Sequence, residues 1–76
     1  MTNDQMRVGI VGTGYAAKLR AETFGQDERS RIVAITGHTP EKIAAFCQTY
    51  QAQAVDSWQR LIAREDIDLV IICTIN

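Results

Sequence analysis

The stretch V-G-I-V-G-T-G-Y-A-A, residues 8–17, decides the fold of this chain. Its first four residues form an apolar run that does not alternate with polar residues, which is typical of a strand covered on both faces. The run stops at Gly12-Thr13-Gly14, and Ala17 completes the spacing G-x-G-x-x-A. A glycine turn between a buried strand and a helix is a setting in which a helix N-terminus binds a pyrophosphate.

The small residues of this turn have separate physical tasks. Gly12 permits the tight turn, Gly14 lets a pyrophosphate approach the backbone, and Ala17 lets the helix pack closely on the strand. Backbone N–H groups at the helix start then point at the phosphates, aided by the helix dipole. The candidate cofactor contacts of this segment are Gly12, Thr13, Gly14, Tyr15 and Ala16. Packing is the alternative for Tyr15, and a turn that merely joins strand to helix is the alternative for the whole motif.

Other glycine-loop ligands fit this sequence less well. A P-loop requires G-x-x-x-x-G-K-[ST], and the sequence contains no such run. A methyltransferase of related fold is expected to carry an acidic residue in the strand ahead of its glycines. That strand, Val8 to Val11, contains no carboxylate.

Outward from the turn, helical and strand patterns alternate. A helix is expected from Tyr15 to Gly25, where glycine suits the C-terminal stop, with Ala17, Ala21, Phe24 and Leu19 as its apolar residues. A strand follows at residues 31–36, and Thr39-Pro40-Glu41 suits the start of a second helix. The apolar stripe of that helix comprises Ile43, Phe46, Cys47 and Tyr50.

The remaining elements complete a β-α-β-α-β-α-β order. A short strand is expected at residues 53–55, then a helix capped by Asp56-Ser57 with Trp58, Leu61 and Ile62 on one side, then a strong apolar strand at residues 68–73. This alternation predicts an α/β fold, a Rossmann-like three-layer αβα arrangement around a partial parallel sheet of order 3-2-1-4. Residues 1–5 are expected to be a flexible tail and residues 6–76 the partial dinucleotide-binding domain.

The end of the second strand indicates which dinucleotide binds. Sites for NAD usually place Asp or Glu there to bind the ribose hydroxyls. This chain instead has Thr36-Gly37-His38-Thr39, followed by Lys42 one helical turn on. A carboxylate would repel a 2′-phosphate, so its absence favours NADP over NAD. A solvated lysine on the helix surface is the alternative for Lys42, and a loop histidine without a ligand is the alternative for His38.

Composition narrows the class of partner. The chain has 76 residues, 46% of them apolar and 22% charged, with a net charge of −1, as expected for one small globular domain that binds neither nucleic acid nor membrane. The first residues are polar and no run of about 18 apolar residues occurs, so neither a signal peptide nor a membrane span is expected. Cys47 and Cys73 form no CxxC motif, which favours reduced thiols in the cytoplasm over a metal site.

The combined pattern resembles the N-terminal half of the Gfo/Idh/MocA oxidoreductases, which include glucose-fructose oxidoreductase, inositol dehydrogenase and biliverdin reductase. The resemblance rests on the glycine turn and on Val33-Ala34-Ile35, Pro40-Glu41-Lys42 and the segment 68–76. It implies that residues 74–76 correspond to the family's Thr-Pro-Asn motif, which lines the cofactor near its nicotinamide half. Thr74 and Asn76 are therefore candidate cofactor residues, while Ile75 departs from the usual proline. Gly37 replaces the family's acid, as in its NADP-using members.

The resemblance also implies a function. A member would transfer a hydride between the nicotinamide and a hydroxyl or carbonyl substrate, expected to be a sugar or polyol. The family's catalytic lysine lies in a Glu-Lys-Pro motif beyond the fourth strand, so no catalytic residue is assigned and the chain is expected to be a truncated piece, inactive alone. The alternatives are a non-catalytic dinucleotide sensor and an assembly fragment that forms a homo-oligomer through the exposed strand at residues 68–73.

Overall fold

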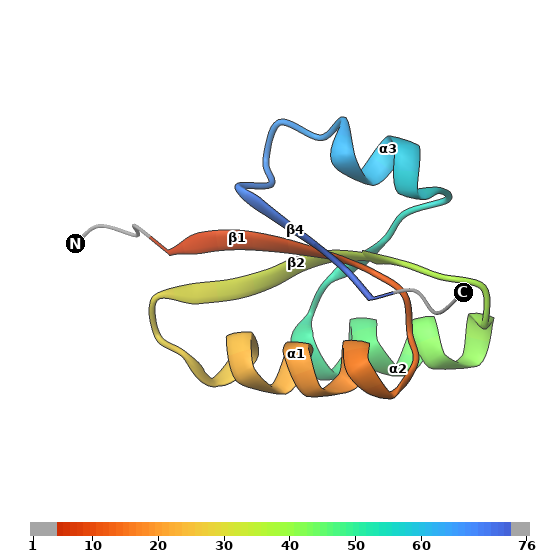
Figure 1. Ribbon diagram of the computed structural model, residues 1–76, viewed down its shortest axis with the longest axis horizontal. Helices are drawn as coiled ribbons and strands as arrows, with labels where there is room; N and C mark the ends of the chain where they lie inside the picture. The colour runs from red at the N-terminus through yellow and green to blue at the C-terminus, as the bar shows by residue number, and fades with distance from the viewer. Residues whose placement is uncertain (1–4, 74–76) are drawn as a thin grey trace.

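The computed structural model describes residues 5–73, which form one parallel sheet with helices on both of its faces (Figure 1). The family-implied Thr74, Ile75 and Asn76 lie outside the described residues, as do residues 1–4 of the expected tail. Along the chain the elements are β1 (Met6–Val11), α1 (Tyr15–Gln26), β2 (Ser30–Thr36), α2 (Pro40–Tyr50), β3 (Gln53–Ala54), α3 (Trp58–Ile62) and β4 (Leu69–Ile72).

The sheet has the order β3-β2-β1-β4, and every neighbouring pair is parallel. Ile10 of β1 lies between Ile35 of β2 and Ile71 of β4, so the centre of the sheet is aliphatic. The register between β1 and β2 shifts by one residue after Val8. This arrangement confirms the predicted α/β class and the strand order 3-2-1-4.

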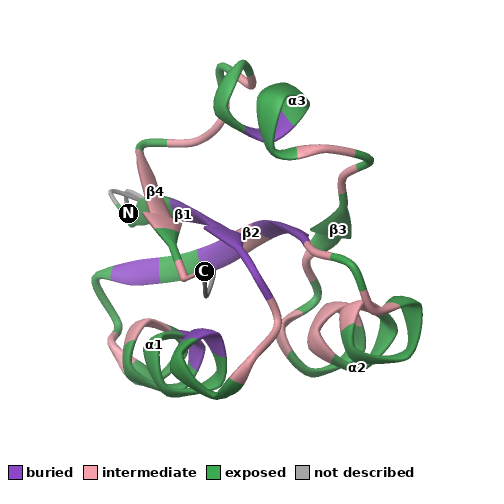
Figure 2. Ribbon diagram, turned by 45° about the vertical axis from the view of Figure 1, so that its right-hand side comes forward, coloured by how far each residue is buried: buried purple, intermediate pink, exposed green. Residues whose placement is uncertain are grey.

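The helices divide between the two faces, with α1 and α2 on one face and α3 on the other (Figure 1). The larger core lies under α1 and α2 and includes Val8, Ile10 and Ile35, each fully buried. On the opposite face Leu61 of α3 is buried against Val11 and Ala34. Figure 2 shows that burial concentrates in β1 and β2, because these strands are covered from both sides.

The predicted end of α1 is wrong by one residue. The helix continues through Gly25 to Gln26, with Asp27 as the C-cap residue. A Cβ atom at position 25 would lie 2.7 Å from Cε1 of Tyr50, so this glycine gives α2 room to pack against α1. Gly25 therefore does not end the helix. It is the small residue at which the two helices pack closely.

Three predicted apolar contacts are also weaker than expected. Leu19 is 45% exposed on α1, while Trp58 and Ile62 are 51% and 49% exposed on α3. The helix α3 has only five residues, and Leu61 is its one buried residue. The predicted cap is confirmed, since Ser57 Oγ accepts a hydrogen bond from the backbone N–H of Arg60.

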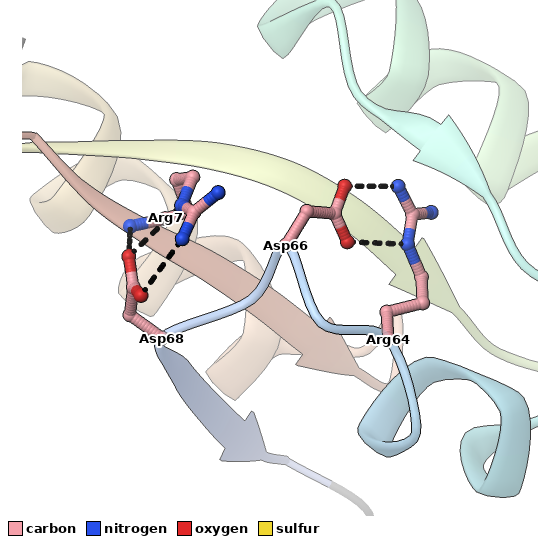
Figure 3. A network of polar contacts seen from close by, with 4 residues as sticks. All are labelled: Arg7, Arg64, Asp66 and Asp68. Atoms are coloured by element: carbon pink, nitrogen blue, oxygen red, sulfur yellow. Dashed lines mark hydrogen bonds and ion pairs between the residues drawn. The ribbon is translucent and has the colours of Figure 1, made fainter.

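Paired charges fix the start of β4 beside β1 (Figure 3). Arg7 donates from Nε and Nη2 to the two carboxylate oxygens of Asp68, at 3.1 Å each, and its backbone N–H donates to Oδ2 at 2.8 Å. These hydrogen bonds from Arg7 hold the pKa of Asp68 below its usual range. The loop before β4 carries a second pair, in which Arg64 donates to both oxygens of Asp66.

Candidate functional site

The turn after β1 is built around a backbone conformation that favours glycine. Gly12 has a φ of 119°, and a Cβ atom there would lie 2.8 Å from the carbonyl oxygen of Cys73. Its N–H donates to the Thr36 carbonyl at 2.7 Å, while the N–H of Cys73 donates to the Val11 carbonyl at 2.8 Å. The turn is therefore clamped between the carboxyl ends of β2 and β4, at the edge where parallel α/β sheets bind ligands.

Gly14 has a different role in the same turn. It is the N-cap residue of α1, with φ −80° and ψ −165°, and no side chain caps the helix. A Cβ atom at position 14 would have no neighbour within 4 Å, so open space faces this glycine. The first turn of α1 carries no acidic residue, and its free N–H groups leave the positive end of the helix available to an anion.

The end of β2 lies against the glycine turn. Thr36 is buried, and a Cβ atom at Gly37 would come within 2.8 Å of Cγ2 of Thr13. His38 is exposed, and Thr39 is the N-cap residue of α2 without a side-chain hydrogen bond. The structure thus brings the turn and the β2–α2 loop together.

A groove of about 510 Å³ opens between α1 and α2 beside the turn. Four of the predicted residues line it, namely Thr13, Gly14, Tyr15 and Lys42. Ala16 is exposed at the helix start and does not line the groove, nor does His38. The other lining residues are Lys18, Glu22, Ala45, Phe46, Thr49 and Tyr50.

Lys18 is one of the groove residues that sequence reasoning missed. Its position three residues after Tyr15 puts both side chains on one face of α1, because residues at i and i+3 are neighbours on a helix. Glu22 continues the same face one turn further on. The spacing signal was present in the sequence, but it could not show that α2 lies opposite this face.

The described residues include two free thiols but no cluster that could hold a metal ion. Burial raises the pKa of the Cys47 thiol and of the Cys73 thiol, the latter partly offset by Arg20, so neither is an activated nucleophile. Within residues 5–73 no group of three His, Cys, Asp or Glu side chains could hold a metal ion. Nor does any helix of this part of the chain have the length and apolar character needed to cross a membrane.

Comparison with known proteins identifies the fold at family level. A family model described as "Oxidoreductase family, NAD-binding Rossmann fold" (GFO_IDH_MocA) matches residues 6–76. The chain belongs to the Gfo/Idh/MocA oxidoreductase family. The matched segment is the NAD-binding part of this family, so a nicotinamide dinucleotide is the class of cofactor supported for this chain.

Solved structures of the Gfo/Idh/MocA family superpose closely on this chain. A biliverdin reductase from Synechocystis sp. PCC 6803, solved with biliverdin and NADP⁺, has 51% identity and a TM-score of 0.85 over 93% of this chain and 22% of its own. A putative myo-inositol dehydrogenase from Sinorhizobium meliloti 1021 has 28% identity and a TM-score of 0.84 over 91% of this chain and 21% of its own.

A curated relative completes the comparison. A glycosyl hydrolase family 109 protein from Porphyromonas gingivalis is 32% identical over an alignment of 81 positions, which covers 93% of this chain and 17% of that protein. The chain therefore spans about a fifth of the length of the relatives it matches.

Proposed function

We propose that this chain is the NADP-binding part of a reductase that acts on a linear tetrapyrrole such as biliverdin. The carrying observation is the 51% identity to the Synechocystis biliverdin reductase, against 28% for the putative myo-inositol dehydrogenase at nearly the same TM-score. Because both superpose equally well, the difference lies in side chains and not in the fold.

The turn fits a dinucleotide pyrophosphate. Gly14 leaves the space that a Cβ atom would fill, and the uncapped N–H groups of α1 supply hydrogen-bond donors. We assign the pyrophosphate to the segment from Gly12 to Ala16, in which Tyr15 is 76% exposed. An aromatic side chain this exposed beside a backbone cradle is available to cover a ligand.

The loop after β2 fits a 2′-phosphate. Position 37, where NAD sites usually carry an acid, is glycine. Thr36 and His38 flank it in the sequence with a hydroxyl and an imidazole, and Lys42 adds a cation in the first turn of α2. The biliverdin reductase with 51% identity was solved with NADP⁺. We therefore assign Thr36, Gly37, His38 and Lys42 to the adenosine end of NADP.

The dinucleotide supplies the hydride when it is bound, and the residues of this chain bind and orient it. The carboxyl end of β4 lies beside the turn, so we assign Thr74 and Asn76, which follow that strand, to the nicotinamide half. No acid or base for the reaction is assigned among residues 5–73. Substrate contacts and proton transfer would come from other parts of the enzyme.

Two measurements test this function. Calorimetric titration should show that the protein binds NADP at least about tenfold more tightly than NAD, which corresponds to about 1.4 kcal/mol. The enzyme containing this chain should consume NADPH in the presence of biliverdin, followed by the loss of the visible absorption of the pigment. Equal affinity for the two dinucleotides would contradict the NADP assignment, and NADPH consumption without loss of the pigment would contradict the substrate.

A polyol or sugar is the second candidate substrate, favoured by the putative myo-inositol dehydrogenase that superposes on the same residues. Reduction of biliverdin would oxidise NADPH, whereas oxidation of a polyol would reduce NADP⁺ or NAD⁺. Reduction of NADP⁺ or NAD⁺ on addition of myo-inositol, with no loss of biliverdin absorption, would favour the polyol. The biliverdin reaction with no response to myo-inositol would favour the tetrapyrrole.

We also propose that copies of the chain associate through β4. This strand forms one edge of the sheet, its Ile72 is 67% exposed, and Leu69, Val70 and Ile71 are only partly buried. An exposed apolar edge pairs readily with another strand. Light scattering that shows a monomer at high concentration would contradict this assembly.

For location we propose the cytoplasm. The two cysteines, Cys47 and Cys73, are free thiols of intermediate burial, as expected in a reducing compartment. Fractionation of the source cells with an antibody against the chain tests this, and recovery outside the cytoplasmic fraction would contradict it.

A further inference from the structure

The groove between α1 and α2 carries an unusual arrangement of positive charge. The sequence contains two lysines, Lys18 and Lys42, and both line this groove, one from each helix. Figure 2 shows the two helices together on one side of the sheet. Because they come from different elements, the two ammonium groups can face a ligand from opposite sides.

Like Arg20 and Arg31, the two lysines form no ion pair within the part of the chain that the structure describes. Arg7, Arg29, Arg60 and Arg64 each form an ion pair with an aspartate. Within residues 5–73, neither Lys18 nor Lys42 has a carboxylate oxygen within 4.0 Å of its ammonium nitrogen, and both side chains are exposed. A doubly charged anion would therefore meet two cations that no internal partner neutralises.

Helix geometry directs both lysines toward the cofactor edge. Side chains on an α-helix lean toward the N-terminus of their helix. Lys18 is the fourth residue of α1 and Lys42 the third residue of α2, so both lean toward the helix starts. Those starts follow the glycine turn and the end of β2, where the adenosine ribose of a Rossmann cofactor lies.

The far end of the groove has the opposite character. Glu22 lies one turn beyond Lys18, and its charge together with burial raises the pKa of Tyr50. Phe46 lies beside Tyr50, with a ring-centroid distance of 6.0 Å. A phosphate is therefore favoured at the lysine end beside the turn and disfavoured at the end that contains Glu22.

We propose that Lys18 and Lys42 form a clamp on the 2′-phosphate of NADP, which makes Lys18 a specificity-determining residue contributed by α1. This inference rests on the proposed NADP function and adds a residue that lies outside the β2–α2 loop. An ammonium group on each side of the phosphate would form charge-assisted hydrogen bonds. NAD lacks that phosphate, so the clamp discriminates between the two dinucleotides.

The test compares NADP, NAD and adenosine 2′,5′-bisphosphate as ligands in calorimetric titrations of the protein. Lys18→Met and Lys42→Met should each weaken NADP and the bisphosphate about tenfold and change NAD by less than about twofold. Arg31→Met is the matched control, because Arg31 is an exposed cation at the other end of β2 and outside the groove. Lys18→Arg should retain most of the NADP affinity.

Each outcome separates the clamp from the proposed function. If Lys18→Met leaves NADP binding unchanged while the wild type still prefers NADP, the clamp is wrong and the function stands. If Lys18→Met weakens NADP and NAD equally, the lysine serves the pyrophosphate or the fold, and the clamp is wrong. Far-UV circular dichroism of each variant identifies loss of folding. If the wild type binds none of the three ligands, both the clamp and the proposed function fail.

Discussion

Replacing Gly12 with alanine should destabilise the fold, because the added methyl group would introduce both backbone strain and steric crowding. A φ of 119° is rarely adopted by residues with a side chain, and such backbone strain costs about 1 to 3 kcal/mol. The added Cβ atom would also lie 2.8 Å from the Cys73 carbonyl oxygen and 3.1 Å from its carbon. Backbone atoms cannot rotate away, so crowding adds about 1 to 3 kcal/mol.

The combined cost, about 2 to 6 kcal/mol, is large for this chain. A domain of 76 residues has a free energy of unfolding of about 4 to 11 kcal/mol. Gly12→Ala therefore removes a substantial fraction of the stability. The clash falls where the β1 turn meets the end of β4, so the turn itself should be displaced and dinucleotide binding lost with it.

Gly14→Ala is the matched control, two residues away in the same turn. A Cβ atom at position 14 meets nothing within 4 Å, and the φ of −80° suits any residue. The stability should fall by about 1 kcal/mol at most, because alanine is a poorer N-cap residue than glycine but introduces neither backbone strain nor a steric clash here. Binding of NADP should nevertheless weaken at least about tenfold, since the methyl group occupies the space assigned to the pyrophosphate.

Urea denaturation followed by far-UV circular dichroism measures both variants, and calorimetry with NADP measures binding. With a slope of about 1 kcal/mol per molar urea, Gly12→Ala should lower the midpoint by about 2 M or more. A Gly12→Ala midpoint equal to that of the wild type would refute the strain argument. Unchanged NADP affinity in a folded Gly14→Ala variant would refute the assignment of the pyrophosphate.

Three further predictions concern the parts of the fold around the site. Leu61→Ala should lower the free energy of unfolding by about 2 to 5 kcal/mol, measured by urea denaturation, because Leu61 is fully buried between α3 and the sheet. Ile62→Ala should lower it by under about 1 kcal/mol, because Ile62 is 49% exposed. Equal losses would contradict the observed packing. Ser57→Ala should cost about 0.5 to 2 kcal/mol by removing the cap of α3, and an unchanged urea midpoint would count against that cap. Hydrogen bonds from Arg29 lower the pKa of Asp27 to about 2 from 3.8, so its contribution is complete above pH 3.8 and is lost as the pH falls through about 2. Asp27→Asn should flatten the stability profile over that range, and an unaltered acid limb would contradict the assignment.

Local patterns predicted most of the secondary structure, and the misses have specific causes. Thr39-Pro40 and Ser57 mark helix starts through short-range effects, so α2 and α3 begin where predicted. The sequence predicts a helix stop at Gly25, but the role of this glycine is set by Tyr50, which lies 25 residues further on. Such long-range contacts leave no periodic signal near the residue they affect.

The candidate site likewise contains residues that the sequence indicates and residues that only the tertiary structure indicates. The segment Gly12–Ala16 and the missing acid at Gly37 were visible in the sequence, because turn geometry and charge act over a few residues. The groove lysine Lys18 was not, because its significance depends on Lys42 lying across from it. The separation of Leu61, buried, from Trp58 and Ile62, exposed, likewise depends on how short α3 is.

The sequence alone determined that this chain alternates strands with helices and that a glycine turn ends its first strand. Periodicity, capping residues and glycine spacing are local properties, and each can be recognised within a short stretch of sequence. Only the tertiary structure decided which distant residues lie together: Gly12 against the Cys73 carbonyl, Gly37 against Thr13, and Lys18 and Lys42 along one groove. Those contacts arise because burial of the sheet fixes where the helices lie, and that constraint acts on the whole chain at once.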